Sequence, residues 1–131
     1  MLSNLSVTDY MATKLITLTK ETDVNEAIKK LMNYKITCAP VVDDHGQLIG
    51  MFSEKDCINA VIDAAYNQGM VGKVGDFMTT EIITIASEAS VLDVAEKFRG
   101  KHVRSFPVFE DVDLVGMISR SDVLRAIVSL Q

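Results

Sequence analysis

Two serine–aspartate pairs are the residues of this 131-residue chain best placed to do chemistry. The stretches Gly50 to Asp56 and Gly116 to Asp122 both read Gly-apolar-apolar-Ser-x-x-Asp. Apolar residues precede each Gly, and an apolar helical spacing follows each Asp, which predicts a turn from a buried strand into a helix. The Ser hydroxyl and the Asp carboxylate should therefore lie at a helix N-terminus in both copies.

Such a turn has two interpretations. In a capping box, the Ser hydroxyl accepts a backbone N–H of the first helical turn, and the Asp carboxylate accepts the Ser N–H. In a ligand site, the free N–H groups of the helix bind an anion, and the carboxylate beside them holds paired sugar hydroxyls. A single copy favours the capping box, which is a common helix start. The duplication, with the same Gly in front, favours a ligand site.

The two turns belong to an internal duplication. A shift of 67 positions places Asp9-Tyr10-Met11 on Asp76-Phe77-Met78 and Pro40 on Pro107, and the shift becomes 66 from Leu48 onward. Each repeat predicts the order β-α-β-β-α, and the repeats span 1–66 and 76–131 with a glycine-rich linker at 67–75. In the first repeat, the expected elements are a strand at 15–18, a helix that starts at Asp23, a hairpin of 38–42 with 48–52, and a final helix after Asp56. In the second repeat, they are a strand at 82–85, a helix that starts at Ser90, a hairpin of 105–109 with 114–118, and a final helix after Asp122.

The composition is that of a globular domain, with 48% hydrophobic and 24% charged residues. The net charge is −5, both halves are acidic and only 6% of residues are aromatic, so we expect no nucleic-acid or anionic-membrane surface. No apolar run approaches membrane-spanning length and the N-terminus lacks a basic signal-peptide start, so a cytoplasmic protein is expected. Cys38 and Cys57 lack metal or redox spacing, which predicts reduced core thiols and no metal site.

With this order of motifs, the chain resembles a tandem CBS-domain pair, the Bateman-type module named after cystathionine β-synthase. The resemblance covers about Val7 to Leu130 and rests on both Asp-aromatic-Met motifs, on Pro40-Val41 and Pro107-Val108, and on both Gly-x-x-Ser-x-x-Asp turns. It implies an α/β fold in which two β-α-β-β-α repeats pack with pseudo-two-fold symmetry as one compact module. It also implies two clefts for adenosine-containing ligands, each lined by both repeats.

The resemblance assigns the ligand-binding residues to two sets, each with a Ser-x-x-Asp turn from one repeat and the first-strand and pre-proline residues of the other. A phosphorylated ligand should prefer the set that holds Lys55 and Arg104, unless both cations are simply solvated surface charges. Adenine is expected against apolar residues such as Ile83 and Phe106. One set comprises Ser53, Lys55, Asp56, Ile83, Thr84, Arg104 and Phe106, and the other comprises Ser119, Ser121, Asp122, Ile16, Thr17, Thr37 and Ala39.

Three functions compete: a regulatory module that senses AMP, ADP or ATP and signals to an unknown partner protein, a structural dimerisation module with empty clefts, and a small enzyme. Both Asp positions are kept, which favours the first. His45 and His102 have no nucleophile at a recognisable spacing, and the two Asp residues occupy equivalent environments, so no catalytic residue is expected. No cofactor is required beyond the regulatory ligand, for which S-adenosylmethionine or a cyclic dinucleotide are alternatives. Apolar final helices predict a homodimer.

Overall fold

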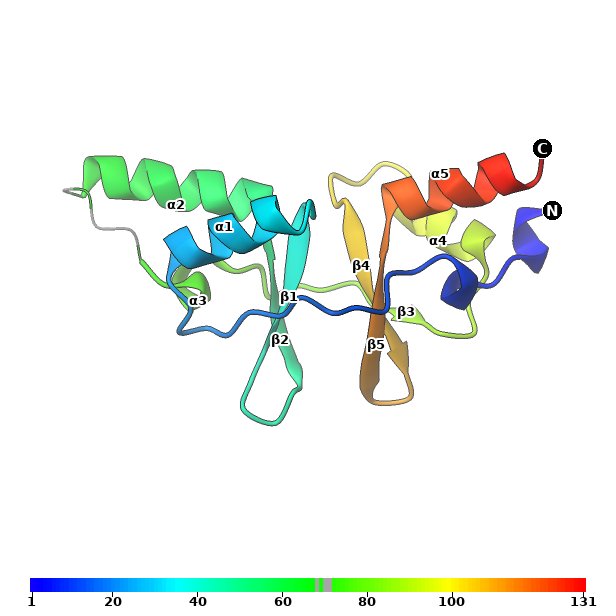
Figure 1. Ribbon diagram of the computed structural model, residues 1–131, viewed down its shortest axis with the longest axis horizontal. Helices are drawn as coiled ribbons and strands as arrows, with labels where there is room; N and C mark the ends of the chain where they lie inside the picture. Colours follow the sequence, from blue (N-terminus) through cyan, green and yellow to red (C-terminus); the bar gives the residue numbers. More distant parts are fainter. Residues whose placement is uncertain (68, 70–71) are drawn as a thin grey trace. The chain divides into compact units, whose positions relative to one another are not determined.

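The computed structural model describes residues 1–67, 69 and 72–131, and it divides into two compact units (Figure 1). The central unit comprises residues 16–82, and the terminal unit comprises residues 1–15 together with 83–131. Each unit therefore combines most of one repeat with the first residues of the other. The predicted linker at 67–75 includes residues 68, 70 and 71, which lie outside the described residues.

The central unit is a β-hairpin covered by helices. The strands β1 and β2 are antiparallel, with Pro40 opposite Met51 and Val41 opposite Gly50. The side chains of Val24, Phe52 and Ala60 are completely buried and join the first helix, the hairpin and the second helix in one core. The elements are α1 (Val24–Asn33), β1 (Cys38–Val42), β2 (Leu48–Ser53), α2 (Glu54–Tyr66) and α3 (Val74–Phe77).

The terminal unit is a three-stranded sheet with helices packed on it. Its strand order is β3-β4-β5, in which β3 runs parallel and β5 antiparallel to β4. Val7 is completely buried among Val108 and Ile118, so the start of the chain is part of this core. The elements are the 3₁₀ turns η1 (Leu2–Asn4) and η2 (Val7–Asp9), followed by β3 (Ile85–Ala86), α4 (Val91–Phe98), β4 (Ser105–Glu110), β5 (Asp113–Ser119) and α5 (Arg120–Ser129).

The predicted hairpins and helices are confirmed, but the first strand of each repeat is shorter than expected. Only Leu18 of the stretch 15–18 forms a ladder contact: its N–H donates to Pro40 and its carbonyl accepts from Val42, both at 2.9 Å. In the second repeat, β3 begins at Ile85. The prediction of strands at 15–18 and 82–85 was wrong because β-branched residues indicate extended backbone without showing which residues find a ladder partner.

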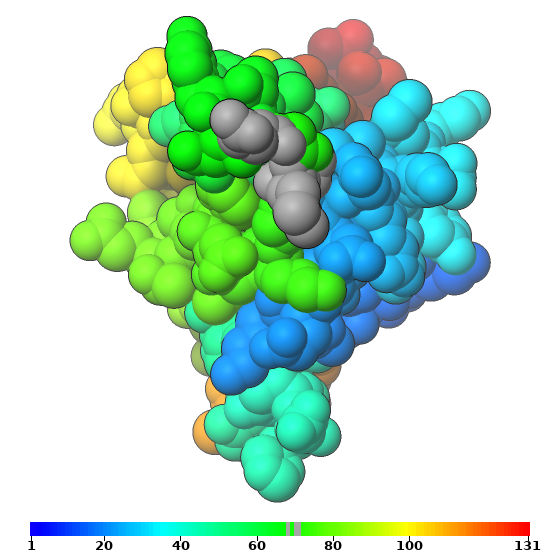
Figure 2. Space-filling model, turned by 90° about the vertical axis from the view of Figure 1, so that its left-hand side faces the viewer, coloured from blue at the N-terminus to red at the C-terminus, as the bar shows by residue number. Residues whose placement is uncertain are grey.

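The turn of the β1–β2 hairpin is built on an aspartate. The Asp43 carboxylate accepts the N–H groups of His45 and Gln47, both at 2.9 Å, and Gly46 adopts a positive φ of 77°. These hydrogen bonds hold the pKa of Asp43 below its usual range. The hairpin tip, cyan at the bottom of Figure 2, projects from the rest of the central unit.

Candidate functional site

Both Ser–Asp turns are capping boxes, as the first interpretation predicted. The Ser53 N–H donates to Asp56 Oδ2 at 2.9 Å, and the Asp56 N–H donates to Ser53 Oγ at 3.3 Å. The corresponding distances for Ser119 and Asp122 are 2.8 and 3.2 Å. Because the capping N–H binds Oδ2 in each copy, the second carboxylate oxygen, Oδ1, is available for another partner.

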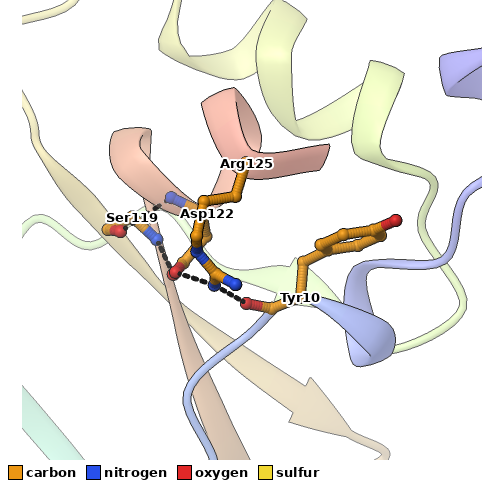
Figure 3. A network of polar contacts seen from close by, with 4 residues as sticks. All are labelled: Tyr10, Ser119, Asp122 and Arg125. Carbon is orange, nitrogen blue, oxygen red and sulfur yellow. Dashed lines mark hydrogen bonds and ion pairs between the residues drawn. The ribbon is translucent and has the colours of Figure 1, made fainter. Parts of the chain in front are cut away.

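The second oxygen is where the two aspartates differ. Asp56 Oδ1 receives the Thr79 hydroxyl at 3.3 Å, a long hydrogen bond from a neutral group. Asp122 Oδ1 receives the Arg125 guanidinium at 2.6 Å, and the same nitrogen of Arg125 donates to the Tyr10 carbonyl at 3.0 Å (Figure 3). The expectation of equivalent environments was therefore wrong: one carboxylate is neutralised by its own chain, and the other is not.

The glycine before each turn is required by close packing. A Cβ on Gly50 would lie 2.6 Å from Met78 Sδ, and one on Gly116 would lie 2.6 Å from Met11 Sδ. Backbone hydrogen bonds hold these contacts in place: Met51 and Thr79 exchange two at 2.8 Å each, and Ala12 and Met117 exchange two at 2.8 and 3.0 Å. The Asp-aromatic-Met segment of each repeat thus pairs with the strand that carries the Ser–Asp turn of the other repeat.

In the central unit, the pre-proline residues Thr37 and Ala39, which the resemblance assigned to the set of Ser119 and Asp122, lie in the same unit as the Ser53–Asp56 turn. The Glu54 N–H donates to the Thr37 carbonyl at 3.0 Å, which holds the start of α2 next to β1. Ala39 is completely buried opposite Phe52. Lys55 is exposed and its side chain has no ion pair within the described residues, whereas Ile16 and Thr17 are half-buried.

The terminal unit repeats this arrangement with different side chains. The Arg120 N–H donates to the Arg104 carbonyl at 3.1 Å, and the Arg104 side chain is exposed. Phe106 is only 1% exposed, and its ring stacks on Phe98 with the centroids 4.3 Å apart. The expectation that adenine lies against the Phe106 ring was therefore wrong for that side chain, since no face of the ring is free. The remaining predicted residues of this unit, Ile83, Thr84 and Ser121, are exposed.

The central unit has a hollow of about 590 Å³ between α1 and α2. Leu31 and Glu54 line this hollow, and at the matching positions of the other repeat stand Phe98 and Arg120. The Arg120 guanidinium lies 5.9 Å from the centre of the Phe98 ring and donates to the carbonyl groups of Val103, at 3.0 Å, and Lys101. Thr37 is the only predicted ligand residue that lines the hollow.

Three residues escaped the sequence interpretation: Thr79 and Arg125, which contact the candidate carboxylates, and Tyr10, which contacts Arg125. A signal for Arg125 was present, because an acidic and a basic residue three positions apart on a helix lie on the same face. Thr79 ends the second Asp-aromatic-Met motif, but Ala12 stands at the matching place, so the duplication did not point to it. The contact of Tyr10 is made by its backbone carbonyl, which no side-chain pattern reveals.

Comparison with known proteins identifies the family. The model of the CBS domain matches residues 7–63 and 74–129. The chain belongs to the CBS-domain family. This assignment confirms the tandem CBS repeats and the α/β fold that the sequence predicted. Among the described residues, no helix is long and apolar enough to cross a membrane, and no cluster of His, Cys, Asp and Glu has a metal-binding arrangement.

The chain is similar to proteins of an archaeon and of a plant. It is 30% identical over 122 residues to the protein MJ1225 of Methanocaldococcus jannaschii, and the alignment covers 93% of this chain and 42% of that protein. It is 32% identical over 114 residues to the mitochondrial CBS domain-containing protein CBSX3 of Arabidopsis thaliana, which covers 84% of this chain and 55% of that protein. The chain thus spans about half the length of these CBS relatives.

Two solved CBS pairs that resemble the chain contain adenosine compounds. The structure of CBSX2 in complex with AMP superimposes with a TM-score of 0.83 at 26% identity, covering 97% of this chain and 98% of that one. The CBS pair of MJ0100, in complex with 5′-methylthioadenosine and S-adenosylmethionine, gives a TM-score of 0.82 at 26% identity, covering 96% and 98%. Both of these structures are CBS pairs, and the fold of this chain is that of a CBS pair.

Proposed function

We propose that this chain binds an adenosine-containing ligand through the Asp56 turn and thereby regulates a partner protein. The observation that carries the proposal is the state of Asp56, a residue that is 6% exposed and whose carboxylate is held in place by the Ser53 N–H. Its Oδ1 atom has only the long contact with the Thr79 hydroxyl. A fixed carboxylate with an acceptor oxygen to spare is suited to the paired hydroxyls of a ribose.

The surroundings of Asp56 suit a phosphorylated ligand as well as a ribose. The turn lies at the N-terminus of α2, a helix of 13 residues, where the backbone N–H groups favour an anion. Lys55 adds an exposed cation to the same turn, while Glu54 opposes it. Arg104, Thr84 and Ile83 of the other repeat remain the proposed partners for the phosphate, the ribose and the adenine, in the cleft that the family resemblance implies.

The proposed role is regulatory binding without turnover. CBS segments similar to this chain also occur within enzymes: the inosine-5′-monophosphate dehydrogenase of Aquifex aeolicus is 30% identical over 112 residues, which make up 22% of that enzyme. Because the matching segment is only 22% of the enzyme's length, we infer that it has a role separate from that of the catalytic part of the enzyme. By analogy, we propose that ligand binding shifts this chain from one conformation to another and that a partner protein binds the two conformations differently. We propose that this takes place in the cytoplasm.

A structural dimerisation module is the second candidate, and the exposed apolar side chains of α2 and α5 favour it. Ile58 and Ile62 of α2 are 60% and 50% exposed, and Leu124 and Val128 of α5 are 61% and 66% exposed. Such helix faces are typical of interaction surfaces. Dimerisation is compatible with ligand sensing, so we propose a homodimer in either case.

A thermal-shift screen separates the two candidates. AMP, ADP, ATP, S-adenosylmethionine and a cyclic dinucleotide are added separately to the pure protein, with inosine monophosphate as a control for the adenine ring. A ligand present at about 100 times its Kd should raise the free energy of unfolding by about 2.7 kcal/mol. Stabilisation by at least one adenosine compound supports the sensing role. No stabilisation by any of them, with a stable dimer, would favour the structural role.

A further inference from the structure

The Asp122 carboxylate is occupied by a side chain of its own helix. Arg125 lies 2.6 Å from Asp122 Oδ1, while Oδ2 accepts the Ser119 N–H at 2.8 Å. The Asp122 side chain is 15% exposed. We propose that Arg125 closes this carboxylate to a ribose, so that the module binds one adenosine-type ligand where the duplication predicts two. This inference rests on the proposed function.

A ribose would have to displace Arg125 from Asp122. The paired hydroxyls of a ribose need accepting positions on the carboxylate, and hydrogen bonds between two ionised groups are stronger than those a neutral hydroxyl offers. The Arg125 side chain is 63% exposed, so it is free to swing into water, but it would lose its contact with the Tyr10 carbonyl as well. Competition of this kind should weaken binding at Asp122 about tenfold or more.

The matching position in the central unit cannot compete for the carboxylate in the same way. Asn59 stands where the other repeat has Arg125, and it is exposed. Within the described residues, Asn59 makes no hydrogen bond to Asp56, whose Oδ1 meets only the Thr79 hydroxyl at 3.3 Å. A neutral hydroxyl can rotate and share the carboxylate with a ligand. The difference between residues 59 and 125 therefore selects which aspartate accepts the ribose.

The same arginine links Asp122 to the start of the chain. Arg125 holds the Tyr10 carbonyl (Figure 3). The Tyr10 hydroxyl lies 2.8 Å from Ser129 Oγ, so both ends of Tyr10 are tied to α5. A ligand that reached Asp122 would break the first of these ties. Closing the site with Arg125 thus also keeps the segment around Tyr10 docked on the terminal unit.

Calorimetric titration with AMP tests the proposal on four proteins. The wild-type chain should bind one AMP with high affinity. Arg125→Asn should gain a second AMP site that is at least about tenfold tighter than any second site of the wild type. Arg125→Lys keeps the positive charge and should therefore bind AMP as the wild type does. The reciprocal change Asn59→Arg, at an exposed position, should weaken the single site about tenfold. It tests the same competition even if Arg125→Asn does not fold.

The outcomes separate this proposal from the function on which it rests. The role of Arg125 would be overturned if the wild type bound AMP at two equal sites. It would also be overturned if Arg125→Asn had one AMP site and Asn59→Arg kept full AMP affinity. Either result would leave the proposed sensing function unaffected. Absence of AMP binding in all four proteins, repeated with ATP and S-adenosylmethionine, would overturn both. One site in the wild type, two in Arg125→Asn and a weakened site in Asn59→Arg would support both.

Discussion

Gly50 packs directly against Met78, so closely that a Cβ on Gly50 would lie 2.6 Å from the sulfur and 3.2 Å from the Thr79 carbonyl oxygen. This contact joins the Asp-aromatic-Met segment of the second repeat to the strand that leads into the Ser53–Asp56 turn. Gly116 and Met11 make the same contact in the terminal unit. The glycine of each Gly-x-x-Ser-x-x-Asp turn is therefore a packing requirement, separate from any role of the Ser and Asp.

The first prediction is that Gly50→Ala destabilises the fold. The added methyl group overpacks the contact with Met78, and overpacking costs roughly 1–3 kcal/mol in the free energy of unfolding. Urea denaturation measures the change. The double variant Gly50→Ala with Met78→Ala should lose less than the two single losses combined, because the smaller side chain makes room. Additive losses would show that the contact with Met78 is not the cause.

The second prediction concerns the two cysteines. Burial, together with the Asp56 carboxylate, raises the pKa of Cys57 to about 11 and that of Cys38 to about 12. Because the thiolate is the reactive form and a free cysteine has a pKa near 8.5, iodoacetamide at pH 8 should modify the native protein at least about a hundredfold more slowly than the urea-unfolded protein.

The same shift fixes the sign of a pH effect on stability. The folded state keeps the thiols protonated at a pH where the unfolded chain has released the protons, so the stability that they contribute is present below about pH 8.5 and is lost as the pH rises toward 11. Mass spectrometry follows the alkylation, and urea denaturation at several pH values follows the stability. Fast native alkylation at pH 8 would contradict the burial of these residues.

The third prediction is a homodimer that depends on the exposed apolar faces of α2 and α5. Light scattering at tens of micromolar should give a dimer mass for the wild type and a monomer mass for Ile62→Glu or Leu124→Glu, because each buries a charge in the interface. Val112→Glu is the matched control, since Val112 is 86% exposed at the tip of a hairpin. A wild-type monomer, or a dimer that survives both helix changes, would count against the interface.

The fourth prediction separates phosphate from ribose recognition. If Arg104 pairs with the phosphate of the ligand, Arg104→Ala should weaken AMP binding about tenfold or more and leave adenosine binding almost unchanged, because adenosine has no phosphate. Lys101→Ala is the control, since it removes an exposed cation from the same loop. Calorimetry with both ligands gives the comparison. Equal losses of affinity for AMP and adenosine would show that Arg104 does not bind the phosphate.

The sequence predicted the hairpins, the helices and both capping boxes because each depends on local patterns: period-two and helical spacing, and Ser and Asp three residues apart. It did not show that Met11 packs on Gly116 and Met78 on Gly50, since those contacts join residues far apart in the chain. The asymmetry between Asp56 and Asp122 was also missed. The duplication suggested equivalent environments for the two carboxylates, whereas one helical residue, Arg125, makes them different.

The most direct measurement of the central claim is the affinity for AMP of Asp56→Asn. This change removes the carboxylate charge that we propose holds the ribose, and charged hydrogen bonds of roughly 1.5–3 kcal/mol predict an affinity about 10 to 150 times weaker. Asp93→Asn is the matched control, because Asp93 closes the same kind of capping box with Ser90 on α4. Full AMP affinity in Asp93→Asn with loss in Asp56→Asn is the predicted result. Unchanged AMP affinity in Asp56→Asn would contradict the account.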